Sequence, residues 1–195
     1  FELRELEEEY EKGIFTLSVI YGRRRVGKTY LIKEFLKRKK GYYFVALESN
    51  ALINLSLLSQ AIYEACGNLK GLPDFQDFEK ALRYLFAYAE EHRIIFVIDE
   101  YPYLAQSAEH ISSLLQKLID EYREKSKLFL ILCGSSMSFM ENQVLGYKSP
   151  LYGRRTSQLK VQPFGYLEAA EFVPSYSYRD KAIVYGITGG IAEYL

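Results

Sequence analysis

The sequence Gly22-Arg-Arg-Arg-Val-Gly-Lys-Thr29 fits the pattern G-x-x-x-x-G-K-[ST]. Its glycines allow a turn tight enough for backbone N–H groups to surround a polyphosphate without Cβ clashes. In this pattern Lys28 supplies a positive charge to the β- and γ-phosphates, and Thr29 supplies a hydroxyl to Mg²⁺. The expected nucleotide contacts form one continuous run, namely Gly22, Arg23, Arg24, Arg25, Val26, Gly27, Lys28, Thr29 and Tyr30.

The surroundings of this run favour a phosphate loop over an incidental glycine turn. An apolar, strand-like stretch, 17–21, precedes it, and apolar residues at helical spacing follow it at 31–36. A helix that begins here adds the positive end of its dipole to the same site. Of the three arginines inside the loop, we expect some to touch phosphate and others to face water.

Two adjacent acids, Asp99 and Glu100, follow the apolar run 94–98. Such an ending is common by itself, but it gains meaning when a phosphate loop comes earlier in the chain. A strand here would place Asp99 near Mg²⁺, usually through water. Glu100 would then face the γ-phosphate and orient or deprotonate the attacking water. The pair indicates an ATPase with a catalytic glutamate, rather than a GTPase or a nucleotide kinase.

Two further segments carry candidate catalytic groups. The apolar run 128–133 ends in small polar residues, of which Ser135 first and Ser136 second are expected to sense the γ-phosphate or hold the water. A helix N-cap near Met137 is the alternative, and it is compatible with that role. Arg154 and Arg155 precede the last expected strand, where an arginine could stabilise charge on the transferred phosphoryl group. The alternative is a surface pair at a turn.

Short apolar runs alternate with segments of helical periodicity, which is typical of a parallel sheet covered by helices. The expected strands are residues 15–21, 42–47, 94–98, 128–133 and 157–161. The first, third and fourth of these are apolar almost throughout, as strands buried on both faces should be. The fold class is therefore α/β.

Helical periodicity is clear in 75–89 and 111–122 and less regular in 51–65. Asp74 is the expected N-cap of the first of these helices. Four basic residues at 37–40 are expected to end the helix after the phosphate loop, with Gly41 as its stop. Cations there complement the helix dipole, which favours a solvated capping face over contact with nucleic acid.

Composition narrows the class of protein. The 195 residues carry 25 basic and 25 acidic side chains, so the net charge is zero. This balance argues against a domain that binds nucleic acid through an overall excess of positive charge. No apolar run approaches the length of a membrane span, and no signal peptide begins the chain. We therefore expect a cytoplasmic protein without a membrane partner. Cys66 and Cys133 are expected to be two reduced, buried thiols. The first residue is not Met, so we expect a chain trimmed from something longer.

Motifs along nearly the whole chain resemble those of the archaeal-type ATPases of the STAND class, which are relatives of AAA+ proteins. These motifs are Phe1-x-x-Arg4-Glu5, GRRRVGKT, VIDE, LCGSS, Pro150-Leu-Tyr-Gly-Arg-Arg-Thr156, Pro163-Phe164 and Thr188-Gly-Gly-Ile-Ala-Glu-Tyr-Leu195. The resemblance implies a three-layer P-loop NTPase with a five-stranded parallel sheet in the order 5-1-4-3-2. It also implies a helical lid and a winged-helix module after the sheet.

The resemblance assigns roles to both ends of the chain. Arg4 is implied to lie close to the nucleotide, as the Phe-x-x-Arg-Glu segment does in such relatives. Their Gly-Gly-x-Pro motif offers its proline to adenine, but Ala192 stands at that position here, which puts this contact in doubt. We expect residues 1–164 to form the ATPase core and residues 165–195 to begin the lid.

These features together predict a module that binds ATP or ADP with Mg²⁺ and converts hydrolysis into a conformational change. The first alternative is a nucleotide-locked signalling switch, or interaction module, with negligible turnover. The second is a DNA-handling AAA+ relative. The expected partners are the nucleotide and a protein client, with a second copy of the chain as a further candidate. Nucleic acid is not expected as a partner.

Overall fold

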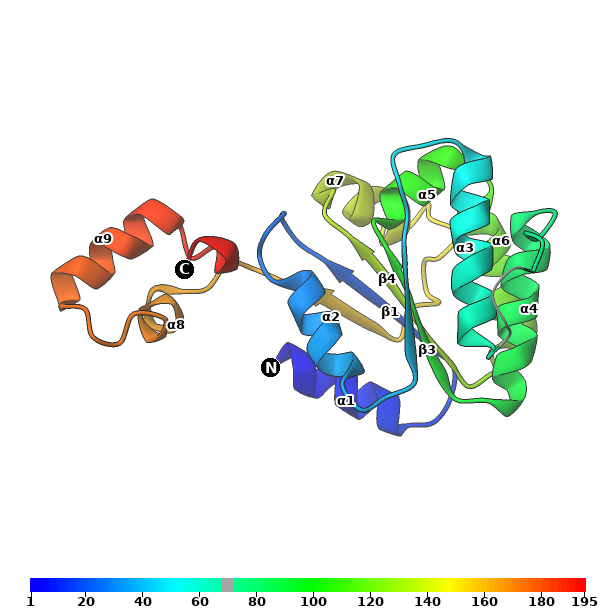
Figure 1. Cartoon of the computed structure of the whole chain (residues 1–195), viewed down its shortest axis with the longest axis horizontal. Helices are drawn as coiled ribbons and strands as arrows, with labels where there is room; N and C mark the ends of the chain where they lie inside the picture. Colours follow the sequence, from blue (N-terminus) through cyan, green and yellow to red (C-terminus); the bar gives the residue numbers. More distant parts are fainter. Residues whose placement is uncertain (68–71) are drawn as a thin grey trace.

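The computed structural model describes residues 1–67 and 72–195. Within these residues, five parallel strands form one sheet in the order β2-β3-β4-β1-β5 (Figure 1). This is the order implied by the resemblance, read from the other edge, so the predicted fold is confirmed. Each expected strand ends within two residues of the observed bounds, which are β1 Thr16–Tyr21, β2 Gly41–Val45, β3 Ile94–Asp99, β4 Leu128–Gly134 and β5 Ser157–Lys160.

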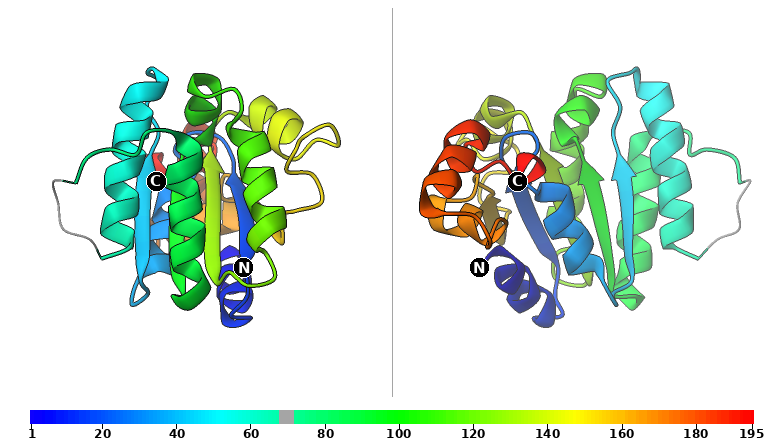
Figure 2. Two further views of the ribbon diagram at one scale, coloured as in Figure 1. Left: turned by 90° about the vertical axis from the view of Figure 1, so that its right-hand side faces the viewer. Right: turned by 60° about the vertical axis from the view of Figure 1, so that its left-hand side comes forward.

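Helices cover both faces of the sheet (Figure 2). One face packs against α1 (Glu2–Glu11) and α2 (Lys28–Leu36); the other packs against α3 (Ala51–Ala65), α4 (Phe78–Glu91), α5 (Tyr101–Ser107) and α6 (Ile111–Tyr122). Side chains of β3 alternate between the two cores. Ile95 and Val97 pack with α2, whereas Phe96 and Ile98 pack with the helices of the other face. This two-sided burial explains why the central strands are apolar throughout.

The chain after β4 continues through short helical pieces. These are α7 (Met137–Phe139), the π-helix η1 (Met140–Val144), α8 (Tyr166–Glu171), α9 (Tyr178–Thr188) and the 3₁₀ turn η2 (Ala192–Tyr194). Helices α8 and α9 lie to one side of the sheet (Figure 1), and the rings of Tyr166 and Tyr185 meet edge to face at 5.7 Å. The boundary at residue 164 stays a prediction.

One backbone contact returns the end of the chain toward the sheet. The Phe164 N–H donates to the Gly190 carbonyl at 2.8 Å. A Cβ at Gly190 would come within 2.0 Å of the Phe164 carbonyl oxygen, so this approach requires a glycine. The turn brings η2 back to the loop that follows β1 (Figure 2).

The expected N-cap of α4 is wrong. The cap is Asp77, whose Oδ1 accepts the Lys80 N–H at 2.7 Å, and not Asp74. The physical reason lies at Phe75, because its N–H is bound to Ser59 of α3 at 3.0 Å. Its ring also stacks on Tyr63 at 4.7 Å. These ties hold the preceding stretch against α3, so the helix begins later.

The expected stop of α2 is also wrong. The helix ends at Leu36, Arg38 makes a left-handed turn, and Gly41 opens β2. The basic run nevertheless contacts the protein as a capping face should, since Lys39 Nζ donates to the Phe35 carbonyl at 2.9 Å and to Glu7 at 2.7 Å. Lys37 pairs with Glu34.

Two further expectations concern the cysteines and membrane-spanning helices. Cys66 and Cys133 are both free and buried, as expected. No helix in the described part of the chain is long and apolar enough to cross a membrane.

Candidate functional site

The phosphate-loop pattern lies at the carboxyl edge of the sheet, between β1 and the start of α2. Gly27 is the N-cap of α2 in a left-handed conformation with φ 100°. Gly22 is fixed by a different constraint, because a Cβ there would lie 2.2 Å from the Val161 carbonyl oxygen after β5. Gly27 therefore sets the backbone turn of the loop, and Gly22 allows the loop to pass close to the chain after the last strand.

The Lys28 side chain contacts the backbone of its own loop. Its Nζ donates to the carbonyl oxygens of Gly22 and Arg23 at 2.9 and 2.8 Å, and the residue is 7% exposed. The ammonium group is thus held at the loop by hydrogen bonds to its backbone carbonyls. The loop thus combines a helix N-terminus, a fixed cation and three exposed arginines, an arrangement suited to a polyanion.

The two acids at the end of β3 take different positions. Asp99 is the last residue of the strand and is 8% exposed, and its Oδ1 accepts the Glu100 N–H at 2.9 Å. Glu100 adopts a left-handed conformation with φ 49° and ψ 44°. This is a sterically unfavourable region for a residue with a Cβ. The left-handed turn at Glu100 interrupts the alternation of side chains between the two faces of the sheet. The consecutive carboxylates of Asp99 and Glu100 can therefore lie at the same edge of the sheet.

Ser135 lies beside Glu100, as the sheet order requires. Strand β4 runs between β1 and β3, so its end lies between the phosphate loop and the acidic pair. The Ser135 hydroxyl donates to the two Glu100 carboxylate oxygens at 3.0 and 3.1 Å. Ser136 is the N-cap of α7 but makes no side-chain capping bond. The contact with Glu100 distinguishes Ser135 from its neighbour.

Tyr43 of β2 is a site residue that sequence reasoning missed. Its hydroxyl makes a short hydrogen bond to Asp99 Oδ2. Burial, followed by the hydrogen bond to Asp99, raises the pKa of Tyr43 far above its ordinary value, so it stays a protonated donor. The alternation of β2 and its pairing with β3 could have indicated this contact, but only once the neighbour and register of β2 were known.

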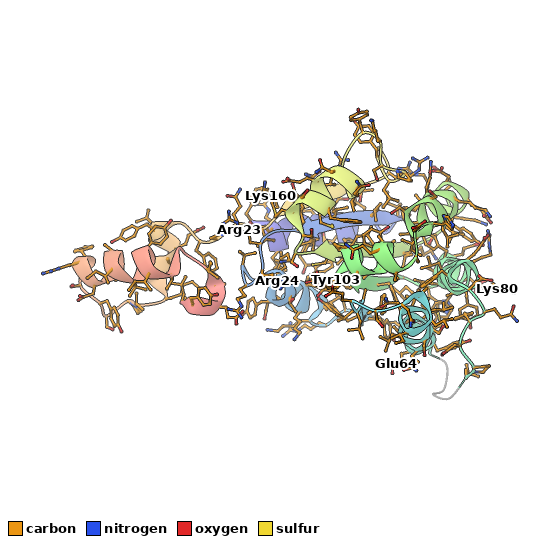
Figure 3. All side chains as sticks on the ribbon, turned by 90° about the horizontal axis from the view of Figure 1, so that it is seen from above. Arg23, Arg24, Glu64, Lys80, Tyr103 and Lys160 are labelled. Atoms are coloured by element: carbon orange, nitrogen blue, oxygen red, sulfur yellow. The ribbon has the colours of Figure 1, made fainter. Side chains whose placement is uncertain are left out.

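A cleft of about 250 Å³ opens beside Glu100. It is lined by Arg24, Glu100, Pro102, Tyr103, Gln106, Ser135 and Ser136. Arg24 of the loop donates to the Tyr103 hydroxyl of α5 at 3.2 Å, and Figure 3 shows the two side chains side by side. The cleft therefore joins the loop, the acidic pair and the end of β4 in one space.

The last residues of the chain contact the loop through Arg25. The Arg25 guanidinium donates to the Tyr194 hydroxyl at 2.7 Å and lies 3.4 Å from the Glu193 carboxylate. The Glu193 N–H also donates to the Arg25 carbonyl at 3.3 Å. Ala192, at the position of the relatives' proline, lies over Gly27, where an added Cβ would meet it at 3.8 Å. Loop and C-terminal segment are thus physically joined.

Comparisons with known proteins agree with this geometry. The whole chain, residues 1–195, matches a family described as an ATPase domain predominantly from Archaea. The chain belongs to this family of archaeal ATPase domains. An uncharacterized protein of Methanocaldococcus jannaschii is 34% identical over 194 residues, which is all of this chain and 42% of that protein. The archaeal ATPase domain thus spans less than half of that relative.

Solved structures share the fold of this archaeal ATPase domain. The Walker-type ATPase of Pyrococcus abyssi superposes with a TM-score of 0.66 and 21% identity, covering 98% of this chain and 63% of that one. A STAND protein of Pyrococcus horikoshii with a tetratricopeptide repeat sensor gives 0.55 and 18%, covering 97% and 28%. The predicted family resemblance is confirmed.

The expected metal ligands of the archaeal ATPase domain fit Mg²⁺. Within residues 1–67 and 72–195, no group of three or more His, Cys, Asp or Glu side chains could hold a metal ion. A hard cation that keeps water and phosphate oxygens as ligands needs few protein oxygens. The Thr29 hydroxyl in the first turn of α2 and the Asp99 carboxylate at the end of β3 would supply oxygens of this kind.

Three expected site residues make their side-chain contacts outside the cleft. Arg154 makes a bidentate pair with Asp120 at 2.8 and 2.7 Å, and Arg155 lies over the Tyr152 ring at 5.7 Å. Both precede β5, so they lie at the amino edge of a parallel sheet, opposite the phosphate loop. Arg4 pairs with Glu8 on its own helix, and its side chain is 85% exposed.

Tyr30, also expected at the nucleotide, is 70% exposed on the first turn of α2. Among the described residues, no hydrogen bond or ion pair joins Tyr30 to Asp99 or Glu100. Its contact with the nucleotide stays a prediction.

Substituting Arg154 is expected to affect stability more than chemistry. Arg154 lowers the pKa of Asp120, so the pair stabilises the fold above the ordinary aspartate pKa of about 3.9 and loses that contribution as the pH falls through the lower folded pKa. Since Asp120 is half exposed, Arg154→Ala should cost less than about 1 kcal/mol at pH 7. Urea unfolding at pH 7 and pH 3 measures this, with Asp120→Asn as the matched partner.

The same variant tests the placement of Arg154. ATP affinity and single-turnover hydrolysis by Arg154→Ala should equal those of the wild type. A large loss of hydrolysis with unchanged stability would mean that Arg154 reaches the phosphates.

Proposed function

We propose that this chain is a Mg²⁺-dependent ATPase domain that adds water to the γ-phosphorus of ATP and releases ADP and phosphate. The observation that carries the proposal is the Glu100 carboxylate, held by Ser135 in the cleft beside the loop that contains Lys28. A carboxylate in that position can accept the proton of an attacking water. Membership of a family of ATPase domains supports the same activity.

Each side chain has a distinct role in this proposal. Lys28 and the N–H groups at the start of α2 bind the phosphates, and Arg24, at the rim of the cleft, adds positive charge. Glu100 orients and deprotonates the water, while Ser135 holds the Glu100 carboxylate in place. When bound, Mg²⁺ neutralises charge on the β- and γ-phosphates, and Thr29 and Asp99 are the residues that would hold it.

Phosphate release from ATP in Mg²⁺ and in EDTA tests this function. We expect turnover in Mg²⁺ and none above background in EDTA. Binding of ATP without release of phosphate, even in a single turnover, would refute the hydrolase and leave the nucleotide-locked switch. Absence of ATP binding would refute both.

A second candidate, the nucleotide-responsive switch, is favoured by the contact between Arg25 and the C-terminal segment. Phosphate would compete with Glu193 and Tyr194 for the Arg25 guanidinium, because all three offer it oxygen acceptors. Nucleotide binding would then loosen η2. Within residues 1–67 and 72–195, no comparable contact favours the DNA-handling alternative, since Lys37 and Lys39 of the basic run pair with Glu34 and Glu7.

Hydrogen exchange of residues 191–194 tests the switch. In the wild type, ATP with Mg²⁺ should speed exchange there as Arg25 turns toward phosphate. In Arg25→Ala, exchange should already be fast and should not respond to nucleotide. Lys33→Ala removes an exposed cation of α2 outside the loop; it is the control and should behave as the wild type. Exchange that is indifferent to nucleotide in the wild type would refute the coupling.

A further inference from the structure

Tyr43 occupies a position that follows from the strand register. Strands β2 and β3 are parallel neighbours in which Val45 lies opposite Asp99 and Tyr43 lies opposite Val97. Tyr43 and Asp99 are therefore diagonal neighbours on one face of the sheet, which a side chain as long as tyrosine can span. That face is the one covered by α2, whose first turn contains Thr29.

Hydrogen-bond donors surround the Asp99 carboxylate. The Tyr43 hydroxyl donates to Oδ2, and the Glu100 N–H donates to Oδ1. Donors on both oxygens fix the orientation of the carboxylate.

Tyr43 is held in place by its own packing. The partly buried ring packs against the core beneath α2, and its hydroxyl contacts Asp99.

We propose that Tyr43 is a positioning residue of the magnesium site, because its phenol fixes the Asp99 carboxylate that would face Mg²⁺. The inference rests on the proposed function in one respect, that Asp99 faces Mg²⁺. Groups that orient metal-binding side chains in this way typically contribute about 10- to 100-fold to metal affinity.

The test compares Tyr43→Phe with Tyr42→Phe. Both variants remove one hydroxyl from β2 and keep the ring, but Tyr42 lies on the opposite face of the sheet, among the residues that pack with α3 to α6. Mn²⁺ binding to each protein in the presence of ADP is followed by electron paramagnetic resonance. Affinity for a fluorescent ATP analogue in EDTA and the melting temperature are measured in parallel.

We expect Tyr43→Phe to weaken Mn²⁺ binding by on the order of 10-fold. Affinity in EDTA should stay unchanged, and Tyr42→Phe should match the wild type in both assays. Unchanged or tighter Mn²⁺ binding by Tyr43→Phe would overturn the proposal, as would an equal loss in Tyr42→Phe. If the wild type binds Mn²⁺ no better with ADP than without it, the proposed metal-dependent function fails instead, independently of Tyr43.

Discussion

Lys28→Ala is expected to abolish measurable nucleotide binding, with a loss of affinity on the order of 100-fold or more. The substitution removes the fixed cation at the phosphates. It also removes the two hydrogen bonds from Nζ to the Gly22 and Arg23 carbonyls that hold the loop in shape. Both effects act in the same direction, because a loop that must first order itself binds more weakly. Calorimetric titration with ATP measures the change.

Lys33→Ala is the matched control for this experiment. Lys33 is exposed on the same helix and outside the loop, so its removal should leave ATP affinity within about twofold. Wild-type affinity in Lys28→Ala, with the control behaving as expected, would refute the phosphate-loop assignment.

Glu100→Gln is expected to bind ATP normally and to hydrolyse it slower by on the order of 100-fold or more. The amide keeps the shape of the side chain and can still accept the Ser135 hydroxyl through its oxygen, but it cannot take a proton from water. Affinity should hold because the phosphate contacts come from the loop. Single-turnover phosphate release and analogue binding, measured on the same preparation, separate the two effects.

Glu109→Gln, an exposed glutamate between α5 and α6, controls for the loss of one negative charge. It should hydrolyse ATP at the wild-type rate. If Glu100→Gln hydrolysed ATP as fast as Glu109→Gln, the base would lie elsewhere in the site, and the role given to Glu100 would be wrong.

Local patterns in the sequence predict the parts of the site that follow directly from one strand. The phosphate loop, Asp99, Glu100 and Ser135 each lie at or just after the end of a strand of a parallel sheet, so they gather at one edge whatever the details of packing. Strands β1, β3 and β4 were predictable because burial on both faces leaves a continuous apolar run.

What the sequence could not supply is the relation between strands. Tyr43 acts on Asp99 across a register that no local pattern encodes, and Arg25 meets Tyr194 at a separation of 169 residues. Arg154 is a different case, because a signal was present. A residue just before a parallel strand lies at the edge opposite the loop, so strand direction argues against contact within one chain. Its partner, Asp120, was not predictable from spacing.

At position 100, the residue that would be most stable in this backbone conformation differs from the residue that the proposed chemistry requires. A left-handed conformation costs a residue with a Cβ roughly 1–2 kcal/mol, and glycine would avoid most of that cost. The residue most comfortable at this position therefore has no carboxylate to offer, and the residue that the chemistry needs is held there by the surrounding sheet and the Ser135 contact. Selection for a more stable fold alone would drive position 100 toward glycine and leave an ATP-binding protein without its base.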